Sequence, residues 1–139
     1  MEPTTAADWM AIADERLADA QAILKERTES VASVYMAGYA IECALKALLQ
    51  KRGIASPSYG REGHDLRGLW SAAKLPFSAS QDPQGTQTFF FEEWNTTLRY
   101  EKFLPSKSGL KPEELLKGAK KLKRLIYSQI NRKKLRKHP

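Results

Sequence analysis

The 139-residue sequence is poor in the residues from which proteins build cross-links and metal centres. It contains one cysteine, Cys43, and two histidines. A single cysteine excludes an intramolecular disulfide framework, and because Cys43 lies in an apolar segment we interpret it as a small buried side chain rather than a nucleophile. Zinc sites need about four Cys, His or carboxylate ligands held together, so the sequence predicts no metal site.

Several other signatures are missing. No glycine-rich loop has Walker or dinucleotide-binding spacing, and no Gly-x-Ser-x-Gly elbow is present, so sites of those types are excluded and no cofactor is expected. The N-terminus lacks the apolar stretch of a signal peptide. The longest apolar run is short and interrupted for a bilayer span, so we expect a cytoplasmic protein without a membrane partner.

Acidic residues are missing from the end of the chain, where basic residues are concentrated. Ten of the 23 Lys and Arg residues lie between Leu115 and Pro139, a segment without Asp or Glu. This segment accounts for more than the whole net charge of +7. Such asymmetry favours a polyanionic partner, nucleic acid before membrane, although a solubilising tail would have the same composition. The candidate nucleic-acid contacts are Lys117, Lys120, Lys121, Arg124, Arg132, Lys133 and Lys134.

The spacing of apolar residues predicts an all-α protein. Hydrophobic residues recur at helical intervals from the start of the chain to about Arg27, from 30 to 52 and from 112 to 130, and no stretch alternates as a strand would. We expect an up-and-down antiparallel bundle of four to five helices. The length suits a single domain over residues 1–139 with a basic tail from about residue 131.

Local signals place the ends of these helices. Thr5 and Asp8 have the spacing of an N-terminal capping pair, Gly53 suits a left-handed helix end, and Pro112 suits a first helical turn. A short helix is predicted from His64 or Asp65 to about residue 74.

The aromatic stretch 88–100 is ambiguous between strand and helix on its composition. A spacing of four residues between its large apolar side chains favours one helix whose buried side holds Phe90, Trp94 and Leu98.

Two charged residues lie inside the most apolar predicted helix. Glu42 and Lys46 are either an exposed i,i+4 pair worth about 0.2–0.5 kcal/mol, or an interior pair whose carboxylate orients an Arg or His from another helix. His64 is likewise either a helix-start residue that caps backbone groups or a member of such a cluster. Arg99 ends the aromatic stretch, where a cation near a helix C-terminus is expected on dipole grounds alone.

Taken together, these segments resemble the HEPN domain. The resemblance rests on Glu42-Cys-Ala-Leu-Lys46-Ala-Leu-Leu, on His64-Asp-Leu and on Arg99-Tyr100, and it spans about residues 8 to 130. It implies a helical bundle, usually a homodimer, of a kind found in toxin–antitoxin, phage-defence and RNA-processing systems. Such domains are often encoded beside a small nucleotidyltransferase, which the resemblance implies as a partner.

Many active members of that family are metal-independent endoribonucleases whose signature is an Arg, four to six residues, and a His. After Arg99 the corresponding positions hold no histidine; they are Phe103, Leu104, Pro105 and Ser106. Without it, no general base for the ribose 2′-hydroxyl is evident. Arg99 and Tyr100 instead match the Arg-Tyr of members that lack the nuclease motif, for some of which nucleotide binding has been suggested.

The sequence thus supports three functional hypotheses. The first is a non-catalytic module that binds RNA, a nucleotide or a partner protein in a groove lined by His64, Arg99, Tyr100 and the basic last helix, with Glu42 and Lys46 as further ligand-binding candidates. The second is a divergent endoribonuclease centred on Arg99, with His64 or Glu42 as proton acceptor. The third is a protein-interaction unit that dimerises and engages a nucleotidyltransferase-like partner.

Overall fold

The computed structural model describes residues 3–55, 64–76, 82, 85–104 and 109–132. Within these ranges the regular structure is helical and no strand is present, which confirms the all-α prediction. The elements are α1 (Ala6–Glu26), α2 (Val31–Lys51), α4 (Leu66–Ala72), α5 (Thr86–Glu92), the 3₁₀-helix η2 (Thr96–Tyr100) and α6 (Pro112–Ile130).

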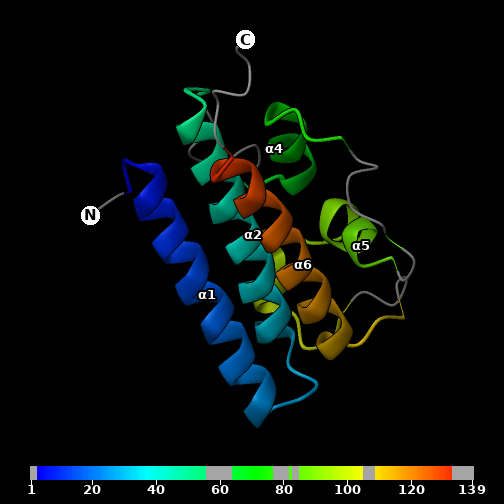
Figure 1. Ribbon diagram of the computed structural model, residues 1–139. Helices are drawn as coiled ribbons and strands as arrows, with labels where there is room; N and C mark the ends of the chain where they lie inside the picture. Colours follow the sequence, from blue (N-terminus) through cyan, green and yellow to red (C-terminus); the bar gives the residue numbers. More distant parts are fainter. Residues whose placement is uncertain (1–2, 56–63, 77–81, 83–84, 105–108, 133–139) are drawn as a thin grey trace.

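The central element is α2, against which α1, α4, η2 and α6 all pack (Figure 1). α1 runs antiparallel to α2, whereas α6 runs in the same direction as α2. The chain returns from the end of α2 to the start of α6 through the short helices α4, α5 and η2 rather than through one long helix. The bundle is therefore up-and-down, as expected, with its third segment broken into pieces.

Small residues allow α2 to be covered on several sides. Four alanines at helical spacing are fully or almost fully buried, so neighbouring helices can approach its backbone closely: Ala37, Ala40, Ala44 and Ala47. By length and composition alone α2 would qualify as a membrane-spanning helix, which the interruptions in its sequence had led us to exclude. Most of that stretch is buried under the other helices, as in the core helix of a globular domain.

The ends of the helices follow the signals in the sequence. Thr5 Oγ1 accepts a hydrogen bond from the Asp8 amide at 3.1 Å, and the Asp8 carboxylate accepts one from the Thr5 amide at 3.3 Å. Gly53 has a φ of +70° just after α2, a conformation that favours glycine. Asp65 caps α4 by accepting from the Gly68 amide at 3.2 Å.

The aromatic stretch 88–100 is not one helix, and that prediction is wrong. Asn95 separates α5 from η2, because its backbone is extended and its side-chain oxygen accepts from the Thr97 amide at 2.8 Å, which caps η2. The predicted buried side is nevertheless correct, since all three of its members are buried: Phe90, Trp94 and Leu98.

Trp94, next to this break, lies directly on the backbone of α2 at Gly38. A Cβ built on Gly38 would lie 2.1 Å from Cε2 and Nε1 of the Trp94 ring. The same ring stacks on Tyr35, one turn earlier in α2, with 5.9 Å between centroids and 17° between planes. Gly38 is therefore required because the Trp94 ring approaches the backbone of α2 closely, although glycine costs a helix about 0.5–1 kcal/mol relative to alanine.

We expect Gly38→Ala to lower the free energy of unfolding by about 1–3 kcal/mol, because the added methyl group would overlap the Trp94 ring. In a Trp94→Ala background the same substitution should instead raise it by up to about 1 kcal/mol, because alanine is the better helix former once the ring is gone. Urea denaturation of the four proteins in this cycle measures both effects. An equal cost in the two backgrounds would show that Trp94 does not require Gly38.

Candidate functional site

Glu42 is buried and holds two basic partners. It is 2% exposed and Lys46 is 4% exposed, so the pair lies in the interior, as the second of our two interpretations has it. Glu42 Oε2 accepts from Lys46 Nζ at 3.0 Å, and Oε1 lies 3.0 Å from Nδ1 of His64. The Lys46 ammonium also lies 5.3 Å from the centre of the Trp9 ring. One carboxylate thus connects α2 to the segment that begins α4.

His64 turns its second ring nitrogen away from Glu42. Because Nδ1 faces the carboxylate, it is the nitrogen that carries hydrogen in the neutral ring, and Nε2 is left as an acceptor for a ligand. The side chain is 39% exposed and lines a cavity of about 640 Å³. The other lining residues come from the start of α4, from α5 and from the segment that leads into η2: Asp65, Phe91, Glu92, Trp94, Asn95, Thr96 and Thr97.

Most polar groups around this cavity have structural partners. Asp65 and Asn95 cap α4 and η2, as described above. The Glu92 carboxylate pairs with Arg67 at 3.4 Å. The cavity therefore offers a ligand few polar contacts besides Nε2 of His64.

Arg99 and Tyr100 lie at the end of η2, beside the first turns of α2. The guanidinium carbon of Arg99 is 5.1 Å from the centre of the Tyr100 ring, and Tyr100 is 76% exposed. Hydrogen bonds to the hydroxyls of Tyr100 and Tyr35 raise the pKa of the Arg99 guanidinium above its ordinary value. Tyr35 is itself stacked on Trp94, so Arg99 lies beside an aromatic cluster on α2.

Arg99 and His64 lie near different turns of α2. The hydroxyl of Tyr35 is one of the groups that raise the pKa of Arg99, whereas His64 bonds to Glu42, seven residues further along. A helix rises 1.5 Å per residue, so these two positions on α2 are about 10 Å apart.

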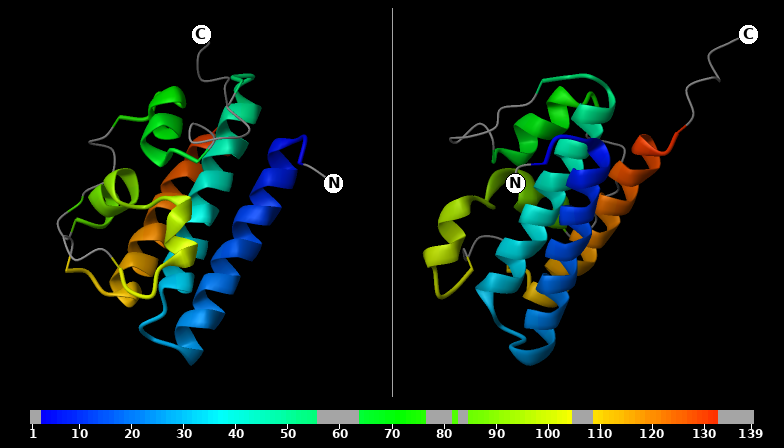
Figure 2. Two further views of the ribbon diagram at one scale, coloured as in Figure 1. Left: turned by 180° about the vertical axis from the view of Figure 1, so that it is seen from behind. Right: turned by 90° about the vertical axis from the view of Figure 1, so that its left-hand side faces the viewer.

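The basic residues of α6 lie on another surface. Figure 2 (right) shows α6 and η2 on opposite sides of α2. A single groove lined by His64, Arg99, Tyr100 and the last helix stays a prediction, which the placement of η2 and α6 on opposite sides of α2 does not favour. Of the residues predicted to contact nucleic acid, five are exposed: Lys117, Lys120, Lys121, Arg124 and Arg132. Lys133 and Lys134 lie outside the described residues.

Cys43 is buried in α2, and burial raises the pKa of its thiol to about 12, with the neighbouring Glu42 carboxylate adding to the effect. A thiol with this pKa is not a nucleophile at neutral pH. Within the described ranges, no group of three or more His, Cys, Asp or Glu side chains is placed to hold a metal ion.

Sequence reasoning missed Lys102 and Phe103. Phe103 is 82% exposed, and together with Tyr100 it makes up the large hydrophobic side chains that are exposed in the described part of the chain. The segment therefore contains two pairs of a cation and a ring, Arg99 with Tyr100 and Lys102 with Phe103, separated by the exposed Glu101. We call the four paired residues the 99–103 platform. The pairing is visible in the sequence, where we had considered Phe103 only as a residue in place of a histidine.

Comparison with known families decides the relationship of this chain. The family model described as HEPN domain matches residues 6–129, from the first residue of α1 to the last turn of α6. The chain belongs to the HEPN family. No curated protein and no solved structure matches it. HEPN domains are associated with RNA binding and RNA cleavage and with toxin–antitoxin or defence systems, and in this chain no histidine follows Arg99 at the spacing of the nuclease signature.

We expect Glu42→Gln to lower the free energy of unfolding by about 3–5 kcal/mol, because it leaves the Lys46 ammonium buried without a counter-charge. Adding Lys46→Met should recover most of this loss. The matched control is Asp19→Asn, which breaks the partly exposed Arg16–Asp19 pair and should cost less than about 1 kcal/mol. Urea denaturation gives all three values. A Glu42→Gln cost no larger than that of the control would contradict a buried pair.

Proposed function

We propose that this HEPN domain binds single-stranded RNA without cleaving it, and that the 99–103 platform makes the contact. The observation that carries the proposal is the exposure of two aromatic rings, Tyr100 and Phe103, each preceded in sequence by a cation, Arg99 and Lys102. Proteins that bind single strands combine rings on which bases stack with cations that follow the phosphates. Exposed large rings of this kind are typical of an interaction site.

The surroundings of the platform support this role. Tyr35 and Tyr39 are partly exposed on the adjacent turns of α2, with 6.4 Å between their ring centroids, so the aromatic surface extends onto the central helix. The Arg99 guanidinium lies 5.1 Å from the centre of the Tyr100 ring, so a cation and a ring are already side by side.

The basic face of α6 would serve as a second electrostatic surface. Its residues Lys117, Lys120, Lys121 and Arg124 follow one exposed stripe of the helix. Lys123 is not part of it, because its ammonium pairs with Asp14 of α1 at 2.8 Å. Since this stripe lies across α2 from the platform, it would attract RNA and contribute salt-dependent contacts only for longer strands.

The biological setting belongs to the same proposal. A binding subunit of a toxin–antitoxin or defence-type system fits a HEPN domain in which no histidine follows Arg99 at the nuclease spacing. Three expectations from the sequence stay predictions: the cytoplasmic location, the homodimer and the nucleotidyltransferase-like partner. A solution mass measurement tests the homodimer, and the neighbouring genes test the partner.

We expect labelled single-stranded RNA to bind at about 50 mM salt and to bind more weakly at about 200 mM, as phosphate contacts require. Tyr100→Ala and Phe103→Ala should each weaken binding by about 5–150-fold, the range for loss of one stacked base. Fluorescence anisotropy measures the affinities. Lys51→Ala, at the far end of α2, is the control and should change little. If the unmodified protein fails to bind at about 50 mM salt, the proposal is wrong.

A divergent endoribonuclease is the second candidate, and the contact between Glu42 and His64 favours it. A carboxylate that orients an imidazole whose other nitrogen faces a cavity is a common arrangement for a general base. The position of Arg99, near a part of α2 about two turns away, argues against it within one chain. For this reason we rank it below binding alone.

Incubation of the purified protein with tRNA and total RNA separates the two candidates. We expect the RNA to stay intact, because no base lies beside Arg99. Gel analysis of the products, with Arg99→Ala and His64→Ala prepared in parallel, is the measurement. Cleavage by the unmodified protein that both substitutions abolish would replace the binding proposal with the nuclease.

A further inference from the structure

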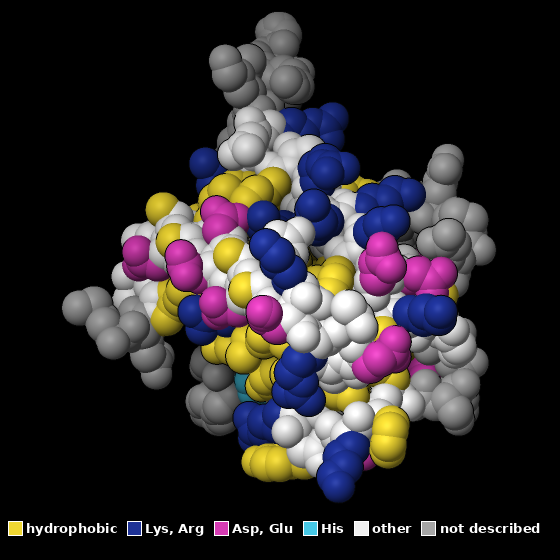
Figure 3. Space-filling view, turned by 90° about the horizontal axis from the view of Figure 1, so that it is seen from below, with side chains coloured by type: hydrophobic (Ala, Val, Ile, Leu, Met, Phe, Trp, Pro, Cys, Tyr) yellow, Lys and Arg dark blue, Asp and Glu magenta, His cyan; other side chains and the backbone are white. Residues whose placement is uncertain are grey.

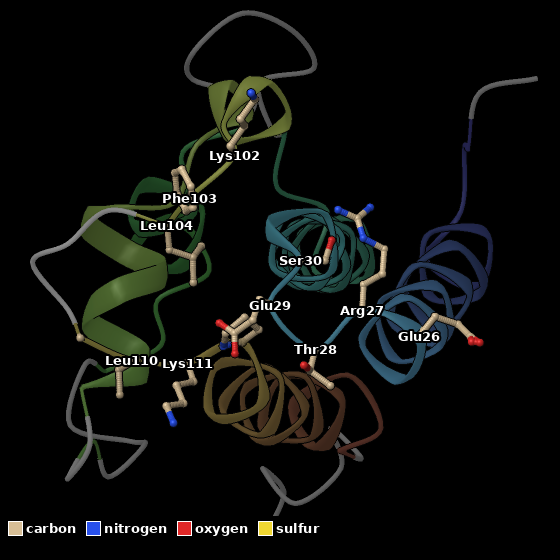
Figure 4. A pocket seen from close by; sticks show the side chains of 12 residues that line it. Glu26, Arg27, Thr28, Glu29, Ser30, Lys102, Phe103, Leu104, Leu110 and Lys111 are labelled. Atoms are coloured by element: carbon tan, nitrogen blue, oxygen red, sulfur yellow. The ribbon is translucent and has the colours of Figure 1, made fainter.

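The end of the bundle beside the 99–103 platform contains a cavity of about 800 Å³. It lies at the turn between α1 and α2, and it is bordered by the starts of α2 and α6 and by residues 102–104 (Figure 4). Lys102 and Phe103 of the platform are among its lining residues. The cavity therefore begins where the platform ends.

Three segments each bring one cation to this cavity. Arg27 follows α1, Lys102 follows η2, and Lys111 precedes α6. Figure 4 shows these side chains on different sides of the opening. Within the described ranges, no hydrogen bond or ion pair engages the side chains of Arg27 and Lys102. Their charges are therefore available to an anion.

Two carboxylates, those of Glu26 and Glu29, also line the cavity, so the cations outnumber them by one. Glu29 points toward the start of α6 (Figure 4), where the positive end of a 19-residue helix offsets its charge. Glu29 is nevertheless the acidic group that a bound phosphate would meet. Removing its carboxylate should therefore strengthen the binding of a phosphate.

A second cavity, of about 480 Å³, adjoins the first and shares Thr28, Glu29 and Lys111 with it. It continues between α1 and α6, where Gln21, Leu24 and Lys25 line it. We call the two cavities together the end groove. On this end of the molecule, basic and acidic side chains are interspersed, and along the lower edge of Figure 3 basic side chains lie beside hydrophobic ones.

We propose that the end groove is a second subsite for the RNA strand, in which Arg27 and Lys111 contact the phosphates that follow the bases stacked on the platform. The inference rests on the proposed function and adds a direction to it: the strand leaves the platform past Lys102 and crosses the end of the bundle. A volume of about 800 Å³ is within the range of cavities that hold a drug-sized ligand, so the first cavity has room for more than a single phosphate.

The test compares short and long oligouridylates, of about four and about ten nucleotides, by anisotropy at two salt concentrations. The longer one should bind at least about tenfold more tightly, because it fills both subsites. Arg27→Glu should remove this gain, and it should reduce the slope of log affinity against log salt concentration by about one. The shorter oligomer should bind to this variant as before. Glu29→Gln should strengthen binding of the longer oligomer several-fold. Lys51→Glu, the same charge reversal at the far end of α2, is the matched control.

The outcomes separate the inference from the proposed function. If neither oligomer binds, both are wrong. If both bind equally well, or if Arg27→Glu weakens the longer oligomer no more than Lys51→Glu does, the platform binds RNA and the end groove does not. An unchanged affinity in Glu29→Gln would also overturn the end groove. Circular dichroism of each variant shows whether it is folded, and Glu29→Gln, which is expected to gain affinity, cannot owe that result to unfolding.

Discussion

The close approach of Trp94 to Gly38 determines how the exposed residues of this protein are presented. The ring occupies the space that a side chain on α2 would need, and it reaches this place because the chain is extended at Asn95, between α5 and η2. The ring in turn stacks on Tyr35, whose hydroxyl is one of the groups that raise the pKa of Arg99. A packing contact in the interior thus positions the aromatic surface beside an exposed arginine, and it does so at the expense of helix propensity in α2.

The buried carboxylate of Glu42 has a comparable role two turns further along α2. It neutralises the charge of the buried Lys46 ammonium and also bonds to the His64 ring, so the segment before α4 is attached to the central helix by a polar contact. Buried ion pairs contribute little net stability compared with apolar packing, but losing one partner is costly.

The surface of the domain follows from these anchors. η2, at whose end the 99–103 platform begins, lies on one side of α2, α6 lies on the other, and the end groove passes between the starts of α2 and α6. In the proposed binding mode, bases of a short strand would stack on the platform, and the dispersed cations would add salt-dependent phosphate contacts as the strand becomes longer. A platform that continues into a groove is therefore suited to an extended, unpaired strand.

Helix boundaries, caps and family membership could be read from the sequence, because Thr5, Asp65, Gly53 and the apolar spacing of each helix act over a few neighbouring residues. The sequence alone also named the candidate ligand-binding residues, which are Glu42, Lys46, His64, Arg99 and Tyr100. Only the tertiary structure decided that Glu42 faces inward, that Asn95 interrupts the aromatic helix, that Phe103 is exposed, and that α6 and η2 lie on opposite sides of α2. The physical reason is that the burial of a side chain and the direction in which it points depend on which helices pack together. Those helices are brought together by contacts between residues far apart in the chain.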